Sequence, residues 1–335
     1  MFASLRDWAA GYVGQFWATL VLGAVVIMTV LAVNVLFLVW LERKLSGHIQ
    51  RRLGPMEVGP HGSLQTVADM LKLLGKQLLT PVATDRMVYL LAPPMVFFPT
   101  LALASLLPLS GSEAFADMPY GLLVVLAISA LTVLAIFMAG WSSNNKYAVL
   151  GGMRSVAQVI AYEIPVLLAV LSVVMVAQTM NLRQIVDVQR VGLPFALVQP
   201  VAMLLFFIGM TAETNRAPFD IPEAESELVG GFHTEYSGMR FAMFFFAEYT
   251  NMLVLGALGA TLFFGGWSGP FLPGPVWLLL KAYAVIFVMI WMRWTWPRLR
   301  FDQLMTFAWK LLIPVALVNL AVTAVVLAFL PGRQG

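Results

Sequence analysis

The sequence predicts an all-α integral membrane protein, a single membrane domain over residues 1–335 with about eight transmembrane helices and an interfacial amphipathic helix. Two observations lead to this fold class. The chain is 60% hydrophobic and 11% charged over 335 residues, which is more apolar surface than a soluble domain of this length can bury. Its apolar stretches also run for roughly 17–25 residues, the length that a helix needs to cross the ~30 Å hydrocarbon core.

Eight apolar stretches have about this length. They lie near residues 17–41, 87–108, 120–141, 155–178, 196–213, 240–264, 276–292 and 308–330. The first is too long for the apolar part of a signal peptide, and charged residues follow it in place of a small-residue cleavage site. We therefore expect it to be the first transmembrane helix.

The distribution of basic residues predicts the orientation. An even number of helices places both termini on one side, where the loops carry four Lys and Arg residues against fifteen on the opposite side. By the positive-inside rule, both termini lie on the outer (periplasmic) side of a prokaryotic cell (inner) membrane and the long loops are cytoplasmic. These loops are the first inner loop, residues 42–86, and the acidic inner loop, residues 214–239. Lys281, inside the seventh helix, is expected to snorkel toward the interface.

Within the first inner loop, residues 63–79 have the pattern of an amphipathic helix. Leucines and a valine recur at helical spacing on one face, and Gln65, Asp69, Lys72 and Lys76 occupy the other. Such a helix is too polar to span a bilayer and should lie in the interface plane. It either braces the membrane surface or covers an opening through which an amphipathic, lipid-soluble substrate enters.

Acidic residues gather in one segment. The chain has 17 Asp and Glu residues in total, and seven of them fall within 36 residues: Glu213, Asp220, Glu223, Glu225, Glu227, Glu235 and Glu248. Like charges so close together raise one another's pKa, so partly buried members can exchange protons near neutral pH. The alternative interpretation is a solvated acidic loop or a docking surface for a basic partner.

Two glutamates are expected at one depth inside the membrane. Glu163 lies nine residues beyond Arg154 and Glu248 eight beyond Arg240, so both would lie roughly 12 Å below the inner surface. An ionisable group at that depth usually faces a polar interior, and Pro165 frees a nearby backbone carbonyl that can hold water. We expect a wet, acid-lined path from the inner surface to mid-membrane; the alternative is a structural carboxylate bonded to a neighbouring helix.

Basic and tryptophan residues follow the first and seventh helices. They include Arg43, Arg52, Arg293, Arg298 and Arg300. By spacing alone, such residues are typical of anchors to anionic lipid headgroups.

The composition also excludes several kinds of site. With zero cysteines the chain cannot hold an iron–sulfur cluster by thiolates, and its histidines, His48, His61 and His233, all fall in expected loops. No P-loop, dinucleotide fingerprint, catalytic triad or metal-ligand cluster is present, so we expect no catalytic residue, no metal and no nucleic-acid partner for this chain.

Several motifs, taken together, identify a family. The sequence resembles the membrane subunits of respiratory complex I that are counterparts of mitochondrial NADH dehydrogenase subunit 1, and the resemblance covers essentially the whole chain. It is carried by Leu41-Glu42-Arg43-Lys44, Gly54-Pro55 through Gly59-Pro60, Ala68-Asp69-Met70-Leu71-Lys72-Leu73, Ala139-Gly140-Trp141-Ser142-Ser143-Asn144, Arg154 through Glu163, Ala212-Glu213-Thr214-Asn215-Arg216-Ala217-Pro218-Phe219-Asp220, Ala247-Glu248-Tyr249-Thr250-Asn251 and Pro297-Arg298-Leu299-Arg300-Phe301-Asp302.

The resemblance implies a subunit of a proton-pumping NADH:quinone oxidoreductase. Such a subunit forms much of the quinone chamber with subunits of the hydrophilic arm, contacts small membrane-arm subunits and carries no redox cofactor; FMN and iron–sulfur clusters belong to partners. By this resemblance, the quinone-binding residues are Arg43, Arg52, Asp69, Arg293, Arg298 and Arg300. The proton-coupling residues are Glu163, Glu213, Asp220, Glu223, Glu225, Glu227, Glu235 and Glu248.

The sequence departs from the family pattern at Met56, Glu57, His61 and Gln77, near the expected quinone entrance. Three other functions remain open at this point: the related membrane subunit of an energy-converting hydrogenase or ferredoxin-linked complex, an independent transporter, and a passive anchor for the hydrophilic arm.

Overall fold

A computed structural model describes residues 15–110, 117–222 and 225–329. Glu223 lies outside these residues, and of Glu225 only the backbone is described. Every regular element in the described part of the chain is helical, which confirms the predicted all-α class.

Seven helical segments among the described residues are long and apolar enough to span a membrane, in agreement with a multi-pass membrane protein. Six are single helices, and the seventh joins α13 to α14 through a π-helical turn at Ala308–Leu312. Their bounds are α2 Gln15–Ile49, α4 Arg86–Leu106, α5 Gly121–Ser142, α6 Lys146–Ala177, α11 Gly238–Phe263, α12 Gly274–Thr295, α13 Phe301–Phe307 and α14 Ile313–Phe329.

The expected helix at 196–213 is interrupted near its start. A short helix, α8 (Phe195–Val198), is followed by Gln199 in a non-helical conformation and then by α9 (Pro200–Glu213). Pro200 has no N–H to continue the hydrogen-bond ladder, so the helix restarts there. At 1.5 Å per residue, the 14 residues of α9 cover about 21 Å, less than the ~30 Å hydrocarbon core.

Several helices extend beyond their apolar stretches. Helix α2 continues through charged residues to Ile49, and α6 begins at Lys146, about nine residues before the expected start. Long basic side chains let a helix run on into the interface, because their charged ends reach water while the backbone bonds remain satisfied. Hydropathy marks only the apolar part of such a helix.

The remaining elements are short and lie in the connections: η1 Pro60–Gly62, α3 Gln65–Gly75, α7 Leu182–Val191, α10 Glu225–Leu228 and η2 Gly231–His233. Helix α3 falls inside the expected range of 63–79 but is shorter, since Lys76 is already extended. Val67, Met70, Leu71 and Leu74 are exposed on it.

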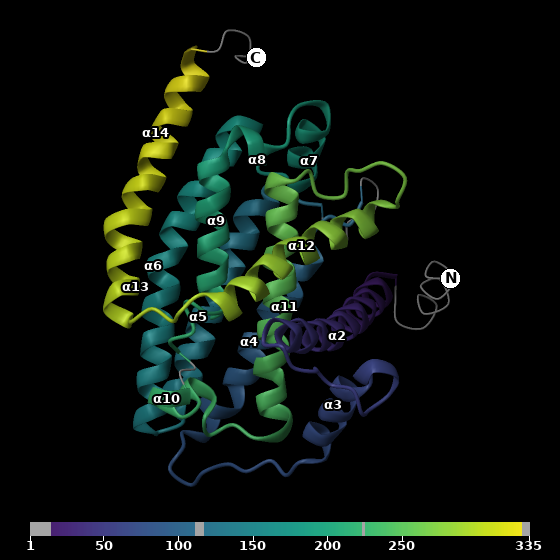
Figure 1. Ribbon diagram of the computed structural model, residues 1–335, viewed down its shortest axis with the longest axis vertical. Coiled ribbons are helices and arrows are strands. Elements are labelled where there is room, and N and C mark those ends of the chain that lie inside the picture. Colours follow the sequence, from purple (N-terminus) through teal and green to yellow (C-terminus); the bar gives the residue numbers. More distant parts are fainter. Residues whose placement is uncertain (1–14, 111–116, 223–224, 330–335) are drawn as a thin grey trace.

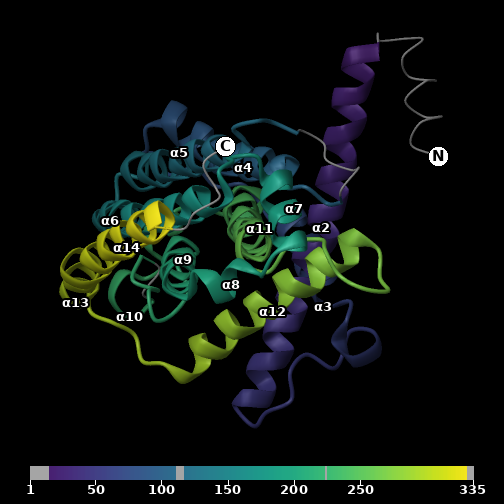
Figure 2. The ribbon, with the colours of Figure 1, turned by 90° about the horizontal axis from the view of Figure 1, so that it is seen from above.

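Helix α11 is the centre of the fold. Figure 2 shows it end on, surrounded by other helices, and every residue from Tyr249 to Phe263 is buried. Its glycines allow close packing: a β-carbon at Gly256 would lie 3.2 Å from Ile286 of α12, and one at Gly259 would lie 3.1 Å from Phe206 of α9. Side chains on α11 can therefore contact elements from both halves of the chain.

Helices α2 and α12 run obliquely to α11 and flank it on one side (Figures 1 and 2). A hydrogen bond of 3.0 Å from the Tyr283 hydroxyl to Asn34 Oδ1 joins them within their apolar parts. The ends of α2 and α12 that carry Glu42 and Arg293 meet beside α11, and the candidate site lies there.

Candidate functional site

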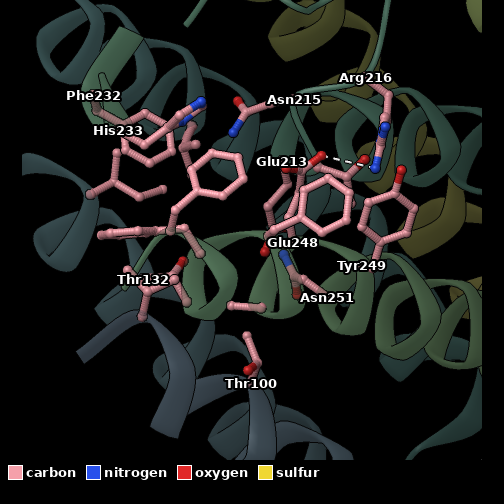
Figure 3. Close-up of a pocket in the computed structure, with 18 of the residues that line it drawn as sticks. Thr100, Thr132, Glu213, Asn215, Arg216, Phe232, His233, Glu248, Tyr249 and Asn251 are labelled. Atoms are coloured by element: carbon pink, nitrogen blue, oxygen red, sulfur yellow. Dashed lines mark ion pairs between the residues drawn. The ribbon is translucent and has the colours of Figure 1, made fainter. Parts of the chain in front are cut away.

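A cavity of about 280 Å³ lies beside α11, bounded by α4, α5, the end of α9 and η2 (Figure 3). Its polar wall is formed by Glu213, Asn215, Arg216, Glu248 and Asn251. Phenylalanines and aliphatic side chains from α4, α5, η2 and α11 form much of the remaining lining. Two carboxyl groups and two guanidiniums, those of Arg216 and Arg293, thus share one partly open space with a mixed polar and apolar lining.

Next to this wall, four charged side chains form a buried ion-pair cluster, defined as Glu42, Arg216, Glu248 and Arg293. The Arg216 guanidinium lies 3.2 Å from Glu42 and 2.9 Å from Glu248, and Arg293 also pairs with Glu42. The Tyr249 hydroxyl donates a 2.7 Å hydrogen bond to Glu42. The side chains of Glu42 and Arg216 are each only 6% exposed, so these charges depend on one another for compensation.

Arg216 is held as a cation by its surroundings. Burial alone would lower its pKa, but the charges of Glu42 and Glu248 and its contact with Tyr249 raise the pKa of Arg216 well above its ordinary value. Its guanidinium also lies over the Tyr249 ring, 4.5 Å from the centroid. The cluster therefore has a fixed positive charge at its centre and a carboxylate on either side.

Glu213 faces the cavity from the last residue of α9. The Asn251 side chain hydrogen-bonds it, and Glu163 of α6 lies near enough for the two charges to interact. Glu163 does not line the cavity, although it is partly exposed. Glu163 therefore interacts with Glu213, and Glu248 pairs with Arg216. That Glu163 and Glu248 lie at one depth in the membrane stays a prediction.

Polar atoms around the cavity lack protein partners. Among the described residues that line the cavity, Asn251 Oδ1 and Arg216 Nε are buried without a hydrogen bond. Buried polar groups are normally satisfied, and a space of this size is several times the ~30 Å³ that one water occupies in the liquid. The chemistry of the wall fits water bridging the carboxyl groups, an arrangement through which protons can move.

The residues that the resemblance assigns to the quinone fall into separate groups. Arg43 of α2 and Asp69 of α3 form a 2.5 Å ion pair, with side chains 43% and 37% exposed. Partial burial acts to raise the pKa of Asp69, but hydrogen bonds from Arg43 and Gln65 outweigh it and lower that pKa. This pair fixes α3 against α2. Of the six quinone candidates, Arg293 lines the cavity.

The other three quinone candidates also lie outside the cavity lining. Arg298 pairs with Asp220 at 2.9 Å, which ties the segment after α12 to the start of the acidic inner loop. Arg52 is exposed and bonds Gln50, and Arg300 is exposed at the start of α13. The predicted quinone residues thus lie in separate places on or near α2, α3 and α12, and the described contacts do not bring them into one site.

The acidic inner loop is fastened mainly to α6 and α4. Glu227 pairs with Arg154 at 2.7 Å, and Glu235 accepts a 2.6 Å hydrogen bond from Asn145. The rings of Tyr89 and Tyr236 stack at 4.2 Å between centroids. Glu227 is 57% exposed, so that part of the loop has the solvated character of the alternative interpretation.

Glu42 is the functional candidate that sequence reasoning missed. It lies within the Leu41-Glu42-Arg43-Lys44 motif, where adjacent bases suggest a surface position, but it is 5% exposed. A helical count would have separated it from Arg43, because consecutive residues point about 100° apart on a helix. Its partners, Arg216 and Arg293, lie 174 and 251 residues away and leave no local signal.

No group of three or more His, Cys, Asp or Glu side chains that could hold a metal ion is found within the described ranges. The charged side chains at this site are ion-paired or line the cavity. The arrangement is suited to proton exchange and charge relay.

Comparison with known proteins agrees with these features. The model of the NADH dehydrogenase family matches residues 22–324. The H subunit of the NADH-quinone oxidoreductase of Brevibacillus brevis is 47% identical over 324 residues, covering 94% of this chain and 96% of that protein. The corresponding H subunit of Geobacillus kaustophilus is 50% identical over 313 residues, covering 92% and 93%. The predicted resemblance is confirmed over most of the chain, which belongs to the NADH dehydrogenase family.

Proposed function

We propose that this chain is the membrane subunit of a proton-pumping NADH:quinone oxidoreductase in which it forms much of the quinone chamber and couples quinone reduction to proton translocation. The names of its relatives support membership of that complex. The observation that carries the coupling role is the buried ion-pair cluster. It links α2 and α12, on the quinone side, to the cavity that Glu213 and Glu248 share on the other side.

On the quinone side, the cationic side chains supply hydrogen-bond donors for the two carbonyls of a quinone. Arg43, Arg293 and Arg298 are the best placed, with Asp69 holding Arg43 and with Arg52 and Arg300 at the margin. The exposed apolar side chains of α3 suit the isoprenoid tail of a lipid-soluble substrate. Helix α3 then covers the entrance, in the plane of the membrane interface.

Coupling follows from charge. Reduction of a quinone consumes two protons and places negative charge transiently in a space of low dielectric constant, where electrostatic interactions are strong. That charge competes with Glu42 for Arg293. A weaker Arg293–Glu42 pair strengthens the hold of Glu42 on Arg216 and loosens Arg216 from Glu248, which becomes the better proton acceptor.

From there, the proton path runs through Glu213 and Glu163 toward the membrane arm, and Asp220, Glu223, Glu225, Glu227 and Glu235 provide the acidic entry. Hydrophilic-arm partners supply FMN and the iron–sulfur clusters, and small membrane-arm subunits and lipids cover the apolar exterior. In this assignment the long loops face the cytoplasm and both termini the periplasm.

The test is photolabelling of the assembled complex in native membranes with a photoreactive short-chain quinone. We expect label in peptides of α2, α3 and the end of α12, and competition by unlabelled quinone. Arg43→Gln should reduce that label. The matched control is Arg183→Gln, because Arg183 forms an equally exposed ion pair with Asp117 elsewhere in the chain.

Label confined to other subunits, or equal loss of label in both variants, would contradict the chamber assignment. Co-purification with a nickel–iron protein in place of an NADH- and FMN-binding arm would favour the hydrogenase alternative.

A further inference from the structure

Gln158 of α6 makes an unusual set of contacts. Its side chain is fully buried, and its Nε2 donates to the backbone carbonyl of Ala212 at 2.8 Å and to that of Phe219 at 2.9 Å. The same nitrogen lies 3.3 Å from Asn215 Oδ1. One side-chain amide thus bonds both ends of the turn at residues 212–219, which begins in the last residues of α9 and continues beyond it.

That segment delivers Arg216 to the ion-pair cluster. The chain turns sharply after α9, with Asn215 at a φ of 49°. The Arg216 N–H bonds Thr211 and the Phe219 N–H bonds the Arg216 carbonyl. The direction of the Arg216 side chain is set by this turn, whose two ends Gln158 holds.

We propose that Gln158 is a positioning residue for coupling, an inference that rests on the proposed function. It fixes the 212–219 turn so that Arg216 reaches both Glu42 and Glu248. Helix α6 also carries Glu163, five residues or about 7.5 Å further along. Gln158 therefore makes α6 a rigid link between a proton-path glutamate and the centre of the cluster.

An amide is the side chain that this place requires. The acceptors are two backbone carbonyls and an amide oxygen, so the group must be a donor, and an ionised carboxylate would repel all three. An unpaired charge of either sign is also costly at a fully buried position. Gln158 Oε1 has no partner in the described part of the chain, which leaves it free to accept from water. Methionine matches the length of glutamine but lacks the donors.

Gln189 offers a matched control. It is 4% exposed, and its Nε2 donates to the carbonyls of Ile185 and Thr261 while its Oε1 accepts from Phe195 and Gly265. It clamps α7 and the end of α11, outside the cavity lining. Gln189→Met removes a comparable set of buried hydrogen bonds without touching the Arg216 turn.

The experiment uses the assembled complex in native membranes. Per assembled complex, we expect Gln158→Met to lower NADH:quinone reductase activity about tenfold or more, because two buried carbonyls lose their donor and the turn relaxes. NADH:ferricyanide activity, which requires only the hydrophilic arm, should stay unchanged. Gln189→Met should lower the amount of assembled complex but not the activity of each complex.

A double-variant cycle separates positioning from general stability. If Gln158 acts through Arg216, Gln158→Met should cost about twofold or less in an Arg216→Lys background, whereas independent sites combine multiplicatively. Multiplicative effects would overturn the proposal. Unchanged activity in Arg216→Lys itself would instead contradict the role of the cluster, so the two failures are distinguishable.

A carboxyl replacement gives a pH readout. Neutral glutamic acid can donate one hydrogen bond to a backbone carbonyl, and the ionised form can donate none. The activity of Gln158→Glu relative to the wild-type protein should therefore fall as pH rises, while that of Gln158→Met should stay flat. The same flat ratio for both variants would refute a requirement for the donor.

Discussion

Glu42→Gln tests the ion-pair cluster most severely, because it keeps the shape of the side chain and removes only the charge. Glu42 pairs with Arg216 and Arg293 and accepts from Tyr249, and its side chain is 6% exposed. After the change, the cluster holds two guanidiniums and one carboxylate, and Arg293 loses its only ion-pair partner among the described residues. We expect the arrangement that joins α2 and α12 to α11 to loosen.

The magnitude follows from burial. Removing one partner of a buried ion pair costs about 3–5 kcal/mol, and the Arg216–Glu42 pair is of this kind. Arg293 is 28% exposed, so water screens its pairing with Glu42, which adds about 1 kcal/mol at most. A loss of about 3 kcal/mol changes an equilibrium about 150-fold, enough to reduce strongly the fraction of complexes with an intact cluster.

The assay compares NADH:quinone reductase activity with NADH:ferricyanide activity in the same membranes. Glu42→Gln should lower the first about tenfold or more, beyond any loss of assembled complex, and leave the second unchanged per complex. Adding Arg293→Gln removes one uncompensated cation and should restore assembly but not activity. Full activity of Glu42→Gln, or worse assembly in the double variant, would refute the reasoning.

Three further predictions concern other contacts. Asp220→Asn breaks the pair with the partly exposed Arg298 and should lower the thermal midpoint of the complex only slightly, by the equivalent of about 1 kcal/mol or less. Lys281→Met removes a donor that bonds three carbonyls at the end of α11 and should cost about 1–3 kcal/mol of thermal stability without changing activity per complex. The contact of Asp69 with Arg43 should be intact above about pH 4 and weaken as pH falls through the lowered pKa of Asp69, seen as lower protection of the α3 amides against hydrogen exchange, relative to the intrinsic exchange rate.

For each of these three predictions, one result would contradict the reasoning. A large loss of stability in Asp220→Asn would mean that the pair is screened less than its exposure suggests. A Lys281→Met complex of normal stability but low activity would indicate a functional role for that ammonium. Asp69→Asn should abolish the pH dependence of that protection in α3; if the dependence persists, another group is responsible.

The sequence predicted much of the fold. Long apolar stretches predicted the seven segments that can span a membrane, because the length requirement acts within each segment. Apolar length did not predict the break at Gln199 before Pro200, which depends on the backbone. It also did not predict helix ends such as Lys146, where polar residues continue a helix. Hydropathy measures side chains and does not register either feature.

The candidate site was less accessible to prediction. Glu213 and Glu248 stood out because charge is rare in this chain, and both line the cavity. Glu42 and Gln158 did not, since one lies among bases and the other is an unremarkable polar residue in an apolar helix. Their partners lie 54 to 251 residues away, so only the packing around α11 brings these groups together.

The proposed function depends above all on proton transfer by the carboxyl groups beside this cluster when quinone is reduced. The most direct measurement is the number of protons pumped per NADH oxidised in sealed vesicles that contain the complex with Glu213→Gln. We predict a lower ratio of protons to electrons together with slower quinone reduction. If both the ratio and the turnover equal those of the wild-type complex, Glu213 is not on the path and the proposed coupling is wrong.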